Sequence, residues 1–184
     1  MKRTFEVAVE DECVLNNVIV FHEEQEIKRM KNWSPLHEMA CVGNLSESTD
    51  DEFDVSPLKL VSGLILKSIN EQDMNGCTPL SWAVSEGNFE SAETLIECGA
   101  EVNCQNFSGE TPLFLACARG YQAICQLLLE SGANPNIPNS EGVYPVHMAV
   151  ASGFYEIVTL LCSRGAFMNV KDDVGDSLLH YAVR

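Results

Sequence analysis

The chain has 184 residues, of which 46% are hydrophobic, and it has a formal net charge of -16. Its longest apolar stretch, residues 58–66, is interrupted by Lys59 and Ser62, which argues against a membrane-spanning helix of about 20 apolar residues. The shortage of Lys and Arg also argues against nucleic acid or an anionic membrane as a partner, because both are bound through basic side chains near phosphate groups.

The eight cysteines form no Cys-x-x-Cys pair, and several fall on the apolar side of expected helices. Free, buried thiols fit this distribution better than a disulfide framework. Cys98 and Cys104 lack the spacing of a zinc site, so no metal site is expected. Acidic residues between Glu6 and Glu12 break up the apolar stretch that a signal peptide needs. The sequence therefore indicates a cytoplasmic protein, with the nucleus as a second location.

Residues 1–32 show no internal repeat and are interpreted as an N-terminal extension. The segment from Trp33 to Ala40 contains a Ser-Pro-Leu-His start of a helix, and the next Pro-Leu start, at Pro79, comes 44 residues after Pro35. Since the later units repeat every 33 residues, residues 33–73 are predicted to be an atypical unit with an acidic insertion at 45–56. Such a surplus is tolerated best as a surface loop between two helices.

From residue 74 onward the same residue types recur at a period of 33. The recurring positions are Gly76, Gly109, Gly142 and Gly175; Pro79, Pro112 and Pro145; Gly87, Gly120 and Gly153; Gly99, Gly132 and Gly165; and Asn103, Asn136 and Asn169. Agreement at so many positions predicts a chain built from stacked copies of one supersecondary unit.

Each recurring residue has a structural reason. A threonine such as Thr78 can cap the first free amides of a helix, and Pro79 fits the first helical position, where its missing N–H costs nothing. Gly87 suits a left-handed helix end that turns the chain into a second helix. Apolar residues in that second helix follow helical spacing, as from Ile124 to Leu129. A glycine then ends the second helix, and a polar Asp/Asn-x-x-Gly turn predicts a projecting hairpin.

The Gly-x-Thr-Pro-Leu phrase, followed by helix, Gly, helix, Gly-Ala and Asn, resembles the ankyrin repeat. The resemblance implies an all-α ankyrin-repeat solenoid with projecting hairpin loops. It covers three full units, 74–106, 107–139 and 140–172, and part of another at 173–184. Several positions depart from the family pattern, and they are Ser81, Phe114, Tyr144 and Leu178.

The resemblance implies a protein that binds other proteins and is not an enzyme. No nucleophile elbow, phosphate-binding loop or His-Glu-x-x-His motif is present, and no catalytic residue or cofactor is expected. His37, His147 and His180 occupy the slot that follows the helix start, where hydrogen bonding between neighbouring turns explains them.

Ankyrin stacks bind partners on a concave surface formed by hairpin tips and first helices. Carried over to this chain, the hairpin positions are Met74, Asn75, Cys77, Phe107, Ser108, Glu110, Ser140, Glu141, Val143, Asp173, Val174 and Asp176. The first-helix positions are Ser85, Glu86, Ala118, Arg119, Ala151 and Ser152. Met74, Phe107, Val143 and Val174 are expected to form an apolar stripe bordered by acids, which suits a partner with a basic or mixed basic and apolar segment. Alternatively, Phe107 only packs against the neighbouring tip.

Two roles remain open for such a binder, which is expected to be monomeric. The phrase from Asn32 to Glu38 resembles the opening repeats of ankyrin-repeat and SOCS-box proteins, which are substrate receptors of cullin ubiquitin ligases, although the chain contains no SOCS-box segment. The acidic stack is similar in principle to the inhibitors of NF-κB, which mask a basic segment of a transcription factor. Apolar residues between Leu178 and Val183 lead us to expect that the last helix frays or is covered.

Overall fold

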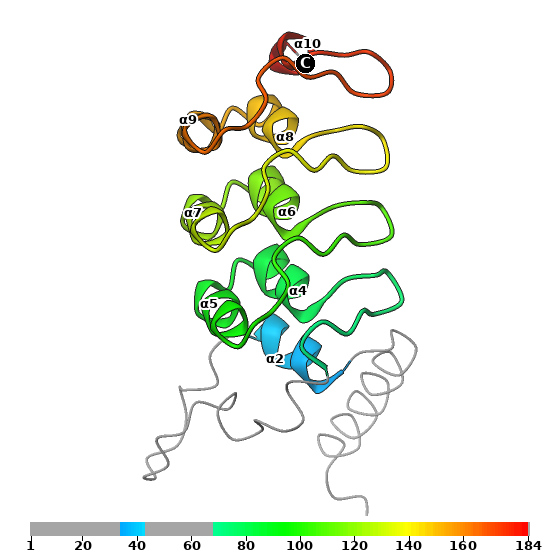
Figure 1. The fold of residues 1–184 in the computed structure, drawn as a ribbon, viewed down its shortest axis with the longest axis vertical. Coiled ribbons are helices and arrows are strands. Elements are labelled where there is room, and N and C mark those ends of the chain that lie inside the picture. The colour runs from blue at the N-terminus through cyan, green and yellow to red at the C-terminus, as the bar shows by residue number, and fades with distance from the viewer. Residues whose placement is uncertain (1–33, 43–67, 184) are drawn as a thin grey trace, which may run out of the picture.

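The computed structural model describes residues 34–42 and 68–183 (Figure 1). Within these ranges it confirms the predicted stack of paired helices with projecting loops. The predicted N-terminal extension at 1–32 and the acidic insertion at 45–56 lie outside the described residues.

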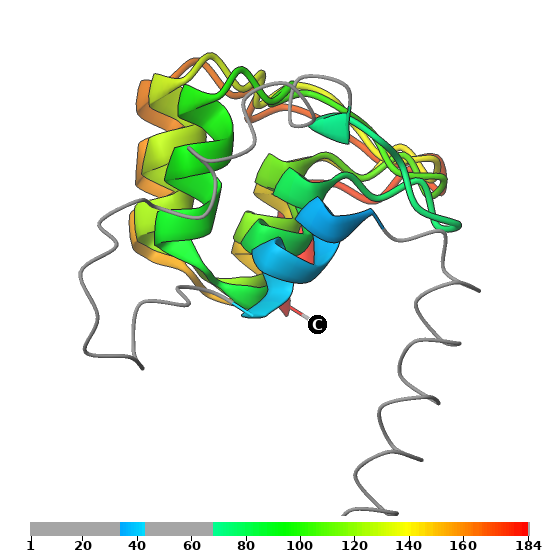
Figure 2. The ribbon, with the colours of Figure 1, turned by 90° about the horizontal axis from the view of Figure 1, so that it is seen from below.

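The helices form two parallel columns. The first helices of successive units are α2 (Pro35–Val42), α4 (Pro79–Glu86), α6 (Pro112–Arg119), α8 (Pro145–Ala151) and α10 (Leu178–Val183). The second helices are α5 (Phe89–Glu97), α7 (Gln122–Glu130) and α9 (Tyr155–Ser163). Figure 2 looks along the stack and shows the units superposed, with the hairpins extending away from the column of second helices. The molecule therefore has an inner face, made by the hairpins and first helices, and an outer face, made by the second helices.

The predicted helix starts are confirmed in two units. The Thr78 hydroxyl accepts a hydrogen bond from the amide of Ser81, and Thr111 accepts one from Phe114, both at 3.2 Å. Where Tyr144 replaces the threonine, the imidazole of His147 compensates, since its Nδ1 accepts from the Tyr144 amide at 3.0 Å. In this unit the side chain within the helix accepts from the amide of the residue before the helix, whereas in the other two units the side chain before the helix accepts from an amide within it.

The ends of the first helices also follow the prediction. Gly87 and Gly120 end α4 and α6 in the left-handed conformation, with φ of 77° and 78°. Helix α8 is slightly shorter, and Ser152 precedes the left-handed Gly153. The chain reverses there and enters the second helix of the same unit.

The core lies between the two columns and runs continuously through the described units. Leu80, Leu113, Leu128 and Leu161 are among its fully buried side chains. Asparagines in the loops that follow the second helices join successive units. Asn103 Oδ1 accepts a hydrogen bond from the Asn134 amide at 2.8 Å. Asn136 accepts in the same way from Phe167 at 2.8 Å.

Helix α10 differs from the helices before it. It begins without a proline, and the Nδ1 atom of His180 accepts a hydrogen bond from the Ser177 amide at 3.0 Å. None of its residues is buried, and Leu179 and Val183 are 78% and 88% exposed. Fraying or covering of this helix remains a prediction. Among the described helices, none is long and apolar enough to cross a membrane.

Candidate protein-binding surface

Four hairpins form the edge of the inner face, and each is built around one Asp or Asn side chain. In the first hairpin, Oδ1 of Asp73 accepts hydrogen bonds from the amides of Asn75 and Cys77 at 2.8 and 2.9 Å. Asn106, Asn139 and Asp172 accept the equivalent pairs of bonds in the following hairpins. Because the side chain satisfies two turn amides, each tip has a defined conformation.

The most exposed part of each hairpin is a two-residue tip. We call the four tips together the hairpin row, residues 74–75, 107–108, 140–141 and 173–174. Backbone hydrogen bonds connect neighbouring tips, from the Phe107 amide to Asn75 O at 3.0 Å, from Ser140 to Ser108 O at 2.9 Å, and from Asp173 to Glu141 O at 3.1 Å. The structure therefore brings eight of the twelve predicted hairpin residues together as one continuous row.

The turn glycines allow the hairpins to approach this closely. Gly76 has a φ of 76°, and a Cβ atom there would lie 2.6 Å from Phe107 Cδ1 and 2.7 Å from the Phe107 nitrogen. At Gly109 the same atom would lie 2.6 Å from the Ser140 nitrogen. Glycine is required at these positions both for the backbone conformation and for the space.

Phe107 packs against the neighbouring tip, and its role in binding a partner stays a prediction. Its ring lies against Gly76 of the neighbouring hairpin, yet 72% of the residue is exposed. Met74 is 54% exposed and Val174 is 87% exposed. The row thus displays apolar side chains to solvent.

Val143 was expected in the apolar stripe, and the structure corrects this, because only 6% of the residue is exposed. It occupies the position that closes the hairpin, where Cys77, Glu110 and Asp176 are half-buried as well. The amide of Val143 donates a hydrogen bond to Asn139 Oδ1 at 2.9 Å. Val143 therefore cannot serve as an exposed anchor.

The predicted first-helix residues line the inner face beside the hairpins. Glu86, Arg119, Ala151 and Ser152 are exposed, and Ser85 and Ala118 are half-buried. Arg119 is joined to the preceding unit, since its guanidinium donates to the Ser85 carbonyl at 2.8 Å and to the Ser85 hydroxyl at 3.1 Å. Ser85 and Arg119 thus form one polar contact between α4 and α6.

A second set of inner-face residues was missed from the sequence. It recurs once in each of α4, α6, α8 and α10, is half-buried throughout, and consists of Trp82, Leu115, Met148 and Tyr181. Trp82 Nε1 donates to Asp73 Oδ2 at 3.0 Å and the Tyr181 hydroxyl donates to Asp172 Oδ2 at 2.8 Å, so these side chains join a helix to its own hairpin. The 33-residue spacing of four large side chains was the signal available in the sequence.

The two aspartates of the hairpin turns each accept a hydrogen bond from an aromatic side chain nine residues later. Asp73 of the first hairpin accepts from Trp82, and Asp172 of the last hairpin accepts from Tyr181. Burial tends to raise the pKa of Asp172, but the hydrogen bonds from Tyr181 and from backbone amides outweigh it and lower the pKa below its ordinary 3.8. Asp172 is therefore held in its charged form by the hairpin it organises.

The three histidines in the helix-start slot have structural roles, as predicted. Nδ1 of His37 accepts from the Ser34 amide at 3.1 Å, and its Nε2 lies 3.0 Å from the Cys77 carbonyl of the next unit. His147 is fully buried, with its ring centroid 4.7 Å from that of Tyr181. Burial lowers the pKa of His147, and the charge of Asp172 opposes this effect. The Nε2 atom of His147 has no hydrogen-bond partner among the described residues.

The thiols in the described ranges are free. Cys117 and Cys125 are fully buried with their sulfurs 3.8 Å apart, and their mutual hydrogen bond and burial raise the pKa of Cys117 well above 9.0. Burial and a hydrogen bond to Glu101 raise the pKa of Cys104 to about 11. Both thiols are therefore protonated and weakly nucleophilic at neutral pH. No group of three or more potential metal ligands occurs within residues 34–42 and 68–183.

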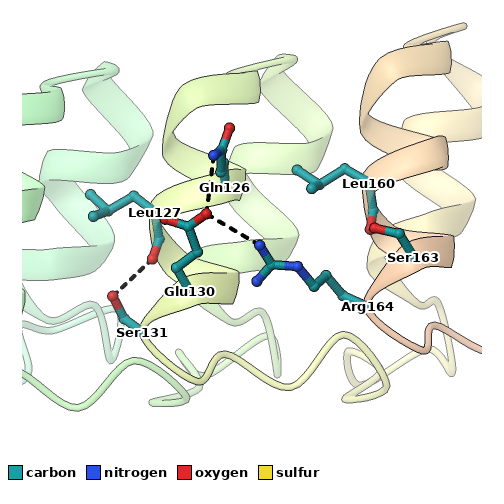
Figure 3. Close-up of polar contacts among 7 residues, drawn as sticks. All are labelled: Gln126, Leu127, Glu130, Ser131, Leu160, Ser163 and Arg164. Atoms are coloured by element: carbon teal, nitrogen blue, oxygen red, sulfur yellow. Dashed lines mark hydrogen bonds and ion pairs between the residues drawn. The ribbon is translucent and has the colours of Figure 1, made fainter.

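The outer face carries polar contacts that are satisfied within the protein. Figure 3 shows Glu130 of α7 at their centre, bonded to Gln126 Nε2 at 3.0 Å and paired with Arg164 at 3.2 Å. The hydroxyls of Ser131 and Ser163 donate to the carbonyls of Leu127 and Leu160. Of these contacts, the pair of Glu130 with Arg164 joins α7 to the end of α9, and the others each lie within one helix or at its end.

Comparison with known families identifies the repeats independently. The family model described as ankyrin repeats (3 copies) matches residues 6–106, 55–139 and 98–172, which together span most of the chain. Among the curated proteins, none gives a significant match. Repeats of this family act as modules for protein–protein interaction and are generally non-enzymatic. The periodic sequence, the stacked helix pairs and the family match agree, and the chain belongs to the ankyrin-repeat family.

Proposed function

We propose that this protein is a monomeric adaptor that binds a partner protein on its inner face, with the hairpin row as the main contact. The observation that supports this most strongly is the exposure of Met74, Phe107 and Val174 on tips that are fixed by backbone hydrogen bonds. Exposed apolar side chains on a rigid support can bind without a large loss of conformational entropy. The acidic composition favours a partner with a basic or mixed basic and apolar segment.

Two cellular roles fit such an adaptor. In the first, the protein is a substrate receptor of a cullin ubiquitin ligase, which the resemblance at residues 32–38 supports. In the second, it is an inhibitor or scaffold that masks a basic segment of a signalling or transcription factor, which the net charge of -16 supports. Both roles place the protein in the cytoplasm or the nucleus.

Affinity purification of the full-length protein from cells, followed by mass spectrometry, tests the proposal. Phe107→Ser should abolish recovery of the partner, whereas Gln126→Ala on the outer face should leave it unchanged. Equal recovery with all three proteins, with unaltered melting temperatures, would place the partner on another surface.

The same experiment separates the two roles. A substrate receptor should retain the cullin complex in the Phe107→Ser variant while it loses the substrate. An inhibitor or scaffold should recover a signalling or transcription factor without any cullin. Recovery of a cullin that itself depends on Phe107 would contradict the receptor role as proposed.

A further inference from the structure

The hairpin row has a fixed order of side-chain chemistry along the stack. Met74, Phe107, Ser140 and Asp173 occupy the same place in successive tips. The last three lie against the turn glycine of the preceding hairpin, where a Cβ atom would be 2.7, 2.6 and 2.8 Å from their respective backbone nitrogens. The row therefore changes from apolar to acidic in a rigid sequence.

The apolar end is formed by the first two tips. Met74 and Phe107 are exposed, and their neighbours Asn75 and Ser108 are exposed and uncharged. Contact with Gly76 on one side holds the Phe107 ring while most of it stays accessible. A pre-oriented aromatic ring of this kind is a typical anchor for a bulky apolar side chain.

The acidic end is formed by the last two tips. Glu141 and Asp173 are exposed neighbours, joined by the 3.1 Å backbone hydrogen bond from Asp173 to the Glu141 carbonyl. Neither carboxylate forms an ion pair within the described ranges. Val174 lies beside them with 87% of its surface exposed. Lys and Arg suit this combination, because their aliphatic stems pack on an apolar residue while the charged ends reach a carboxylate.

Within residues 34–42 and 68–183, the basic side chains form no ion pair with these carboxylates. Arg119 is bonded to Ser85, and Arg164 is paired with Glu130 on the outer face. The exposed Lys171 lies at the base of the last hairpin, where its backbone is bridged to that of Ser177, and its ammonium forms no ion pair with a described residue. Among the described residues, the carboxylates at the tips are therefore without an ion-pair partner.

We propose that the partner binds as one extended segment in a fixed direction along the hairpin row. A bulky apolar residue of the segment contacts Met74 and Phe107, and Lys or Arg further along contacts Glu141 and Asp173. This inference rests on the proposed function and adds the chemistry and the orientation of the bound segment.

Random 16-residue peptides displayed on phage and selected against the whole chain test the inference. The enriched peptides should combine a bulky apolar residue with Lys or Arg on one side of it. Phe107→Ser and, independently, Met74→Ser should lower the affinity of the chain for the synthetic peptides. The loss for Phe107→Ser should be about tenfold or more. Melting curves of both variants establish that they remain folded.

Charge variants locate the basic residues. Glu141→Gln combined with Asp173→Asn should lower the affinity for the peptides severalfold at low salt. The difference in affinity between this double variant and the unmodified chain should shrink as ionic strength rises. Glu71→Gln is the matched control, because it removes an exposed acid beside the apolar end. It should change the affinity by less than about twofold.

Orientation is read by NMR with a nitroxide attached to one end of the peptide. A label next to the apolar residue should broaden the amides of Asn75 and Ser108, and a label next to the basic residues should broaden those of Glu141 and Val174. Reversed broadening, or row-binding peptides without basic residues, would overturn the inference and leave the proposed function standing. Failure to select any peptide that contacts the hairpin row would count against the proposed function itself.

Discussion

Close contact between hairpins should make the turn glycines unequal in their effect on stability. Gly76 and Gly175 occupy the same place in the first and last hairpins, with φ of 76° and 94°. At Gly76 a Cβ atom would meet both the ring and the backbone nitrogen of Phe107, whereas at Gly175 it would meet no described atom within 4 Å. Replacing each glycine by alanine therefore separates conformational strain from crowding.

Gly175→Ala should cost about 1–2 kcal/mol of unfolding free energy, because a residue with a Cβ atom is strained in the left-handed region. Gly76→Ala should cost the same amount plus about 1–3 kcal/mol for overpacking. The added Cβ atom would lie 2.7 Å from the backbone nitrogen of Phe107, which cannot move without shifting the second hairpin. Adding Phe107→Ala to Gly76→Ala should recover only part of the loss, because the backbone contact remains.

Urea unfolding followed by circular dichroism measures these differences, with equal m-values as the check that the variants unfold in the same way. If Gly76→Ala costs no more than Gly175→Ala, the hairpins are not held together as closely as described. The rigid support proposed for the hairpin row would then be wrong.

Three further predictions concern the core and the titrating groups. Leu128→Ala should cost about 2–5 kcal/mol in urea unfolding because it opens a cavity in the core, whereas Phe107→Ala should cost only about 1 kcal/mol, since at 72% exposure it buries about 50 Å²; similar losses would contradict the assignment of Phe107 to the surface. Tyr181→Phe should raise the pKa of Asp172, measured by carboxyl-carbon NMR titration, and should reduce the stability that Asp172 contributes above pH 3.8 and loses as the pH falls below it. For His147 the lowered pKa means that the unfolded chain takes up a proton near pH 6.5 before the folded chain does, so stability should fall as the pH drops below 6.5. His147→Phe, which introduces the residue found at the equivalent buried position Phe114, should flatten that dependence in thermal melts between pH 7.5 and 5.5, and an unchanged slope would show that His147 is not responsible.

The repeat register could be read from the sequence because its signals are local. Thr78 and Pro79 specify a helix start, and Gly87 specifies its end, through backbone requirements that act within a few residues. The same locality holds at Tyr144, where His147 three residues later accepts a hydrogen bond from the Tyr144 amide in place of the threonine cap. The fold follows from such signals.

Exposure at the binding surface was harder to predict because it depends on neighbouring units. Val143 is apolar and close to the tip, but its 33-residue equivalents Cys77 and Glu110 show that the position is at least half-buried. Trp82 and Tyr181 were overlooked because their role depends on hydrogen bonds to hairpins nine residues earlier. Comparison of equivalent positions points to Trp82 and Tyr181 as a recurring set of large side chains, whereas the acidic residues equivalent to Val143 give no sign that the position is buried.

Site-specific photocrosslinking tests the central claim most directly. The photoreactive residue p-benzoylphenylalanine is placed at position 107 on the hairpin row and, in a matched protein, at position 126 on the outer face. Irradiation in cells, followed by mass spectrometry, should give a covalent adduct with the partner from position 107 and none from position 126. An adduct from position 126 alone would show that the partner binds the outer face and would contradict the account.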